Sequence, residues 1–211
     1  MTKIKAIIFD MDGVLIDAKE WHFEALNRAL TLFGMAISRY DHLVTYDGLP
    51  TKTKLRMLSM ERGLPEALHG FINEMKQIYT MEVIYAKCKP VFQHQFALSR
   101  LKAEGYRMAV CSNSIRNTIA MMMERAELLP FLDFFLSNED VTAPKPAPDM
   151  YLKAIERMGL QPTECLIVED NPNGIKAARD SGAHVLCVHD VREVNYANIT
   201  QTIAGLEAKH A

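Results

Sequence analysis

The sequence has no long hydrophobic run. No stretch among its 211 residues approaches the roughly 20 consecutive apolar residues of a membrane-spanning helix. The apolar run near the N-terminus is short, meets an acidic residue at Asp10 and has no small-residue cleavage site, so it does not predict a secretory signal peptide. We therefore expect a cytoplasmic protein with no membrane partner.

An excess of positive charge is also lacking. The 24 lysines and arginines and 26 aspartates and glutamates give a formal net charge of −2, which predicts no nucleic-acid partner. Cysteine is sparse: the four cysteines form no C-x-x-C pair, so neither a zinc ribbon nor a redox dithiol is indicated. Oligomeric state cannot be read from these features, and a monomer is the default expectation.

What the sequence does contain is an alternation of short apolar runs and helical patterns. Apolar runs of this length are typical of strands in a parallel sheet covered on both faces. Such runs lie at residues 4–9, 106–111, 134–137, 165–168 and 184–188, and helical patterns lie at residues 91–102, 115–125, 149–158 and 175–179. The alternation predicts a doubly wound parallel α/β sheet. Asp149, which follows Pro148, is the expected N-cap and loop anchor of its helix.

The region from residue 18 to residue 87 interrupts this alternation. It has no strand pattern, and its apolar residues recur at helical spacing from Trp21 to Phe33, with further helical patterns at residues 53–60 and 68–84. A helical block inserted after the first strand predicts a small cap domain. We expect a core built from residues 1–17 and 88–211, with the cap at residues 18–87.

Acidic residues follow two of the predicted strands. Asp10 and Asp12 end the first, and Glu169 and Asp170 end the strand near residue 168. Such acids can simply cap turns, but ligands of open α/β sheets bind at the carboxyl ends of the strands. Oxygen-only ligands favour Mg²⁺, and we expect the two acidic strand ends to converge on one such ion.

Two further motifs complete a chemical set. Ser112, Asn113 and Ser114 follow a third predicted strand, and Lys145 lies between two prolines. Taken alone, the first is typical of a helix cap and the second of a solvated lysine. Together with the acids they supply a nucleophile, a metal site, hydroxyl donors and a cation. Phosphoryl transfer needs this set, because positioning and charge neutralisation lower its barrier.

The order of these motifs resembles the haloacid dehalogenase superfamily, in its β-phosphoglucomutase and phosphoglycolate phosphatase branch. The resemblance spans residues 3–188 and includes the helical insert. It implies that Asp10 is the nucleophile of an aspartyl-phosphate mechanism and that Asp12 protonates the leaving oxygen and then activates water. It also implies that Ser112, with Asn113 beside it, holds the phosphoryl oxygens and that Lys145 offsets the negative charge gathered around Asp10.

The same resemblance implies a Mg²⁺ site. Its ligands would be Asp10, the backbone carbonyl of Asp12, and Asp170, while Glu169 would be either a direct ligand or a support behind the ligands. A histidine occurs near the place of His22 in β-phosphoglucomutases. We therefore expect His22 either to contact the substrate or Asp12, or to have no catalytic duty.

The cap loop favours hydrolysis over isomerisation. Where β-phosphoglucomutases carry an arginine for the remote phosphate, this sequence has Thr51 with Lys52 beside it. Lysine lacks the two-pronged geometry of arginine, although Lys52 or Lys54 could partly replace it. We expect a phosphoric monoester hydrolase acting on a small phosphorylated metabolite, such as a sugar phosphate, with Lys52 steering the substrate. The alternatives are a β-phosphoglucomutase-type mutase and a non-catalytic module that binds a phosphorylated ligand. Asp12 disfavours dehalogenation, since breaking a carbon–halogen bond needs no proton donor.

Overall fold

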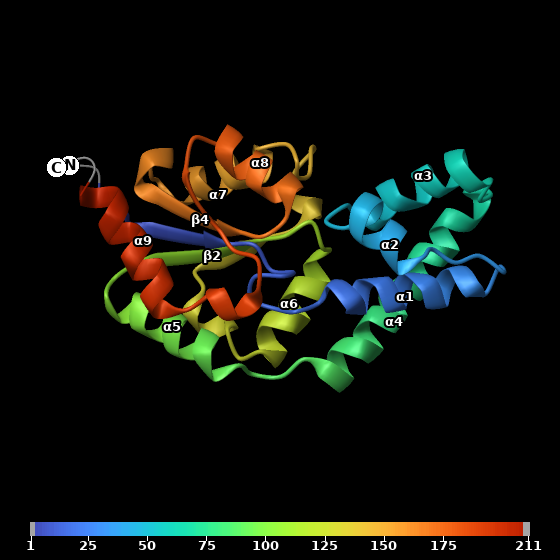
Figure 1. Cartoon of the computed structure of the whole chain (residues 1–211), viewed down its shortest axis with the longest axis horizontal. Coiled ribbons are helices and arrows are strands. Elements are labelled where there is room, and N and C mark those ends of the chain that lie inside the picture. The colour runs from blue at the N-terminus through green and yellow to red at the C-terminus, as the bar shows by residue number, and fades with distance from the viewer. Residues whose placement is uncertain (1–2, 209–211) are drawn as a thin grey trace. The chain divides into compact units, whose positions relative to one another are not determined.

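The computed structural model describes residues 3–208 and divides the chain into two compact units (Figure 1). One unit, here called the core, comprises the described residues up to Asp17 and from Lys89 onward; the other, Ala18–Cys88, is here called the cap. The second crossing between the units thus follows Cys88, one residue beyond the position expected from the sequence. Within residues 3–208, no helix combines the length and apolar character needed to cross a membrane.

The core contains a five-stranded parallel sheet with strand order β3-β2-β1-β4-β5. This confirms the doubly wound α/β fold, and each predicted apolar run forms a strand with a shift of at most two residues at either end. The strands are β1 (Ala6–Phe9), β2 (Arg107–Cys111), β3 (Phe134–Leu136), β4 (Cys165–Glu169) and β5 (His184–Cys187).

Helices cover both faces of the sheet. Figure 1 shows α7 and α8 on one side and α5, α6 and α9 on the other. Ala6 and Ile8 of the central strand pack in one buried cluster with residues of α7 and α8, which explains why an almost uninterrupted apolar run forms this strand. The core helices are α5 (Phe92–Ala103), α6 (Arg116–Arg125), α7 (Asp149–Met158), α8 (Pro172–Asp180) and α9 (Tyr196–Ala208), with short turns η3 (Leu129–Phe131), η4 (Asn138–Asp140), η5 (Pro162–Glu164) and η6 (Val191–Glu193).

The structure corrects the expected start of α7. The N-cap of this helix is Pro148, not Asp149, and no side chain donates or accepts a capping hydrogen bond there. Pro148 already has helical backbone angles, with φ −76° and ψ −7°, so Asp149 is the first residue inside the helix. The helix α9 was not predicted; its buried residues, Ile199 and Ile203, are spaced one turn apart.

The cap is wholly helical, as its sequence pattern indicated. A buried apolar cluster holds it together, in which Leu26 and Leu30 pack with Leu55, Leu58 and Ile72. Its elements are α1 (Lys19–Thr31), α2 (Arg39–Asp41), the π-helical turn η1 (His42–Tyr46), α3 (Thr51–Arg62), η2 (Glu66–Leu68) and α4 (His69–Lys87).

Candidate active site

The carboxyl ends of three neighbouring strands meet at one edge of the core sheet. In the registered ladders, Phe9 of β1 lies opposite Val110 of β2 and Val168 of β4. The next residue, Asp10, therefore leaves the sheet level with the ends of both neighbours, and its backbone N–H donates to the Val168 carbonyl oxygen at 2.9 Å. Open α/β sheets bind their ligands outside the carboxyl ends of the strands, at the point where the strand order reverses. In this sheet that point lies beside β1, which has β2 on one side and β4 on the other.

Lys145 lies at the centre of this edge. Its ammonium nitrogen is 2.7 Å from Asp10 Oδ1 and 2.8 Å from the Cys111 carbonyl oxygen. A third contact joins it to Glu169 Oε1 at 2.7 Å, so all the N–H donors of the ammonium are engaged. Burial of Lys145 acts to lower its pKa, but the charges of Asp10 and Glu169 outweigh this and raise the pKa above its usual value. The side chain therefore stays positively charged.

The loop that carries Lys145 is held by Asn113. The Asn113 side-chain oxygen accepts from the Lys145 backbone N–H, and its side-chain nitrogen donates to the Lys145 carbonyl oxygen, both at 3.0 Å. Asn138 in turn donates to the Asn113 carbonyl oxygen at 2.8 Å. Asn113 thus fixes the position of the lysine, a function that the sequence did not reveal. The expected contact between Asn113 and the substrate stays a prediction.

Hydroxyl groups hold the second aspartate of the first motif. Asp12 Oδ2 accepts from Ser114 Oγ at 3.1 Å and lies 3.5 Å from Ser112 Oγ. The Ser114 backbone N–H donates to Ser112 Oγ at 3.1 Å, which ties the two serines together. Ser114 was not singled out from the sequence, although its place in the string Ser112-Asn113-Ser114 was the available signal.

A tight turn sets the position of Asp12. The Gly13 N–H donates to the Ile16 carbonyl oxygen at 2.7 Å, and the Ile16 N–H donates back to Met11 at 2.9 Å. Gly13 has φ +88°, a conformation that residues with a side chain rarely adopt. The glycine after the acids is therefore what lets the chain fold back and keep Asp12 beside the strand ends.

Three carboxylates gather at the sheet edge: one oxygen each from Asp10, Glu169 and Asp170 lies within 4.8 Å of the others. Burial raises the pKa of Asp10 well above its usual value, and the negative charges of Glu169, Asp170 and Asp12 raise it further, while Lys145 opposes them. A cation bound here would relieve this repulsion. The group can hold a metal ion, and a donor set made only of oxygens fits a hard divalent cation.

Glu169 is enclosed on all sides. Its side chain is 1% exposed, and besides Lys145 it accepts from the Tyr151 hydroxyl at 2.7 Å. Gly174 of α8 approaches it so closely that a Cβ atom there would lie 1.7 Å from Oε1. Only glycine leaves the space that the Glu169 carboxylate fills.

Comparison with known proteins places this site in a family. Residues 7–188 match the family model described as haloacid dehalogenase-like hydrolase. The chain belongs to this family. This confirms the resemblance seen in the order of the motifs, since the matched span contains every strand end described above.

Relatives of this hydrolase cover most of its length. It is 27% identical to a phosphorylated carbohydrates phosphatase of Thermotoga maritima over 85% of the chain and 82% of that protein. It is 28% identical to a phosphoglycolate phosphatase of Nitrosospira multiformis over 88% of the chain and 83% of that protein. Among solved structures, β-phosphoglucomutase from Clostridium difficile superposes with a TM-score of 0.83, covering 97% of the chain and 99% of that chain at 20% identity, a likeness of fold.

The cap of this hydrolase carries its own group of basic residues. His42 is 1% exposed, and burial lowers its pKa to about 4, with the charge of Lys54 adding to the effect. Lys54 and Lys76 are each 7% exposed, and Lys76 Nζ lies 3.5 Å from His22 Nδ1. The four residues His22, His42, Lys54 and Lys76 lie on α1, η1, α3 and α4, respectively.

Lys52 has a different environment from its neighbour Lys54. Lys52 is exposed on α3, whereas Lys54 is buried. Two residues along an α-helix differ by about 200° in direction, so the two lysines face opposite sides. The expected contacts of Lys52 and His22 with the substrate stay predictions. The structure adds Lys76 and His42 as cap residues that the sequence did not rank, and it buries Lys54, which the sequence offered only as a partial replacement for the arginine.

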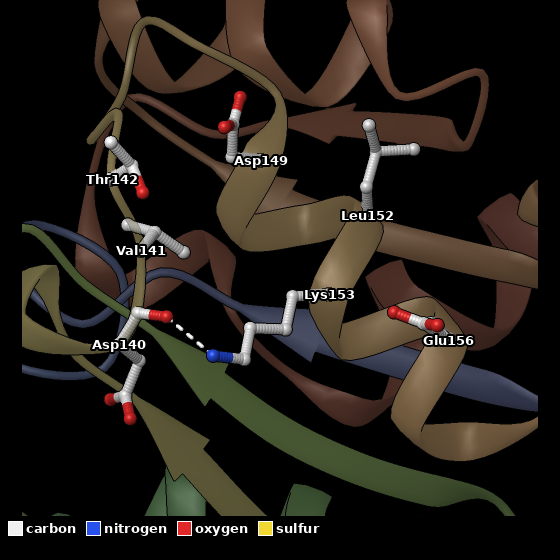
Figure 2. Close-up of a pocket in the computed structure, with 7 residues that line it drawn as sticks. All are labelled: Asp140, Val141, Thr142, Asp149, Leu152, Lys153 and Glu156. Carbon is white, nitrogen blue, oxygen red and sulfur yellow. Dashed lines mark hydrogen bonds between the residues drawn. The ribbon is translucent and has the colours of Figure 1, made fainter.

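An open groove of about 670 Å³ lies elsewhere on the core, along the start of α7 (Figure 2). Figure 2 shows the Lys153 ammonium bonded to the Asp140 backbone oxygen, both residues being among those that line the groove. No member of the carboxylate group Asp10, Glu169 and Asp170 lines it, so we do not assign it to the reaction. Its lining residues are Asp140, Val141, Thr142, Asp149, Leu152, Lys153 and Glu156.

Proposed function

We propose that this hydrolase is a Mg²⁺-dependent phosphatase of a small phosphorylated metabolite that works through an aspartyl-phosphate on Asp10. The observation that carries the proposal is the buried contact of Asp10 Oδ1 with Lys145 Nζ at 2.7 Å, beside the carboxylates of Glu169 and Asp170. The charge of Lys145 favours the ionised form of Asp10, against the burial and the neighbouring carboxylates that raise its pKa, and the ionised carboxylate is the nucleophilic form. The same cation offsets the charge that an incoming phosphoryl group brings.

In the proposed reaction, Asp10 forms and then gives up the bond to phosphorus, and Asp12 carries the protons. Asp10 attacks phosphorus, forming a carboxylate oxygen–phosphorus bond as the ester oxygen–phosphorus bond breaks, and Asp12 gives its proton to the departing oxygen. Asp12 then takes a proton from water, whose oxygen attacks phosphorus and releases phosphate and free Asp10. Hydrogen bonding from Ser114, with Ser112 nearby, holds Asp12 Oδ2 during both steps.

The cation proposed for this site is Mg²⁺. Asp10, Asp170 and the backbone carbonyl of Asp12 would hold it, with Glu169 either beside them or behind them. When bound, it supplies charge neutralisation at the phosphoryl oxygens. We propose that Ser112 and Asn113 contribute further polar contacts there.

We propose that the substrate is a small sugar phosphate. Two relatives with this family's fold are named as phosphatases of phosphorylated carbohydrates and of phosphoglycolate, both small phosphorylated metabolites. The buried lysines of the cap, Lys54 and Lys76, suit a ligand rich in oxygen atoms, and His22 lies beside Lys76. Lys52, which is exposed, suits the steering of an anion by its charge.

The same buried lysines favour one alternative, a β-phosphoglucomutase-type phosphotransferase. A mutase must hold a second phosphate while its bisphosphate intermediate turns round, and two buried cations are suited to that task. Neither lysine offers the two-pronged contact of an arginine, which is why we place hydrolysis first.

The experiment is a phosphate-release screen over sugar phosphates, phosphoglycolate, pyrophosphate and nucleotides, with and without Mg²⁺, using Asp10→Asn as the control. We expect Mg²⁺-dependent release by the unsubstituted chain and none by the variant. A parallel assay supplies β-glucose 1-phosphate with a trace of the bisphosphate and follows both phosphate and glucose 6-phosphate. Rapid isomerisation with little phosphate would favour the mutase, and no turnover of any compound would contradict both.

A further inference from the structure

The Glu169 carboxylate has no acceptor site left for a metal ion. Oε1 accepts from Lys145 Nζ and from the Tyr151 hydroxyl, both at 2.7 Å. Oε2 accepts from the backbone N–H groups of Asp170 at 3.1 Å and Asn171 at 3.2 Å. A carboxylate offers about four lone-pair sites, so donors from this chain fill all of them.

Tyr151 is the donor in this set that a single conservative substitution can remove. It is fully buried on α7, and burial, with the charge of Glu169 adding, raises the pKa of its phenol above the usual value. The hydroxyl therefore keeps its proton and donates. The ring of Tyr151 also lies 4.6 Å from Lys145 Nζ, a cation–π contact that a phenylalanine would keep.

We propose that Tyr151 is a positioning residue of the reaction: by donating to Glu169 Oε1 it keeps Glu169 bonded to Lys145 and out of the metal's coordination sphere. The inference rests on the proposed phosphatase function. It assigns the carboxylate ligands as Asp10 and Asp170 alone. Glu169 then serves as an anionic support that holds Lys145 against the nucleophile.

This arrangement also predicts that the site prefers Mg²⁺ over Ca²⁺. Mg²⁺ demands near-octahedral geometry, whereas Ca²⁺ accepts more oxygen ligands. If the Tyr151 hydroxyl is absent, one site of the Glu169 carboxylate becomes available as an additional ligand. The extra ligand favours Ca²⁺ over Mg²⁺ and loosens the contact between Glu169 and Lys145, which lowers the rate.

The experiment compares Tyr151→Phe with the unsubstituted chain by calorimetric titration of Mg²⁺ and of Ca²⁺ into substrate-free protein. We expect the ratio of the Mg²⁺ Kd to the Ca²⁺ Kd to rise about tenfold, the lower end of effects from residues that support metal ligands. Phosphate release should show kcat about tenfold lower with KM unchanged, since the hydroxyl is fully buried against Glu169.

Tyr46→Phe is the matched control. Tyr46 is a buried tyrosine of the cap whose hydroxyl donates to Glu61 at 2.8 Å, so its loss removes the same kind of bond to a carboxylate that is not one of the three at the sheet edge. Both variants should lose thermal stability to a similar extent, and only Tyr151→Phe should shift the metal preference. A Tyr151→Phe protein with an unchanged Kd ratio and unchanged kcat would overturn the proposal.

A second pair of variants tests the ligand assignment without Tyr151. Asp170→Asn should weaken Mg²⁺ binding far more than Glu169→Gln, because only the first replaces a carboxylate ligand by a neutral amide oxygen, which binds Mg²⁺ more weakly. Equal loss in both would overturn the assignment of Glu169. The titrations need no turnover, so they still decide the matter if the unsubstituted chain releases no phosphate, a result that would refute the proposed function alone.

Discussion

Replacing Gly174 by alanine tests how firmly the Glu169 carboxylate is held. The added Cβ would lie 1.7 Å from Oε1, 2.0 Å from Cδ and 2.3 Å from Oε2 of Glu169, so the carboxylate has to move. Flexible side chains often move at little cost. This one is 1% exposed and accepts hydrogen bonds from Lys145, Tyr151 and two backbone N–H groups, so its displacement breaks bonds.

The sign of the stability change is decided by two opposing effects. Alanine is favoured over glycine within a helix by about 1 kcal/mol. A hydrogen bond to a charged group contributes about 1.5–3 kcal/mol, so breaking two of the four costs about 3–6 kcal/mol. The free energy of unfolding should therefore fall by roughly 2–5 kcal/mol. For a chain of this size, each kcal/mol lowers Tm by about 2–4 °C.

The assay is thermal unfolding followed by circular dichroism, with Gly205→Ala as the control. Gly205 lies in α9 of the same unit, and apart from its chain neighbours and its own helix backbone no atom of residues 3–208 lies within 4 Å of its added Cβ, so that variant should gain stability. In a Glu169→Asp background, where the acidic side chain is one methylene shorter, Gly174→Ala should cost less, which a double-mutant cycle would show. A rise in Tm for Gly174→Ala in the unsubstituted chain would refute this reasoning.

Three further predictions concern the site and the cap. Asp10→Asn should abolish phosphate release without lowering Tm. Asp12→Asn should lower kcat by about 10²–10⁴-fold if acid–base catalysis is lost. A wild-type rate in the Asp10→Asn variant would refute the assignment of Asp10 as the nucleophile. Chelation with EDTA should stop turnover, with Mg²⁺ restoring it better than Ca²⁺; full activity after rigorous metal removal would contradict the metal site. The pKa of His42 is about 4 in the folded chain, against an ordinary value of 6.5. As the pH falls, the unfolded chain therefore binds this proton before the folded chain does. The free energy of unfolding should decrease as the pH falls from about 6.5 to about 4. Thermal unfolding across that range should show a smaller loss for His42→Gln, and an identical pH profile would rule His42 out as the cause.

The fold was predictable because its signal is local. A short apolar run flanked by helical patterns identifies a covered parallel strand, and the acids after Phe9 and Val168 mark strand ends. Neighbouring strands then bring Asp10 and Glu169 together by topology alone. The sequence of α9 carries a weaker signal, since Ile199 and Ile203 alone are buried within this helix.

The supporting contacts of the site were not predictable, because they join residues that no sequence pattern links. Tyr151 reads as one more apolar position of an amphipathic helix, and its hydroxyl bond to Glu169 depends on how α7 packs on the sheet. Asn113 reads as a helix cap, although it holds the backbone of Lys145, 32 residues away. In the cap, the direction of α3 decides that Lys54 and not Lys52 is buried.

The contacts of Lys145 also favour the correct register of the strands during folding. Its ammonium joins atoms at the ends of β1, β2 and β4, namely Asp10, Cys111 and Glu169. A slip in the register of any one of these strands would break at least one of these bonds, and a slip of β1 or β4 would also separate a buried carboxylate from its cation. Misaligned sheets are therefore penalised electrostatically as well as by packing. The same ammonium that contacts Asp10 thus helps to make the correctly paired sheet the favoured end point of folding.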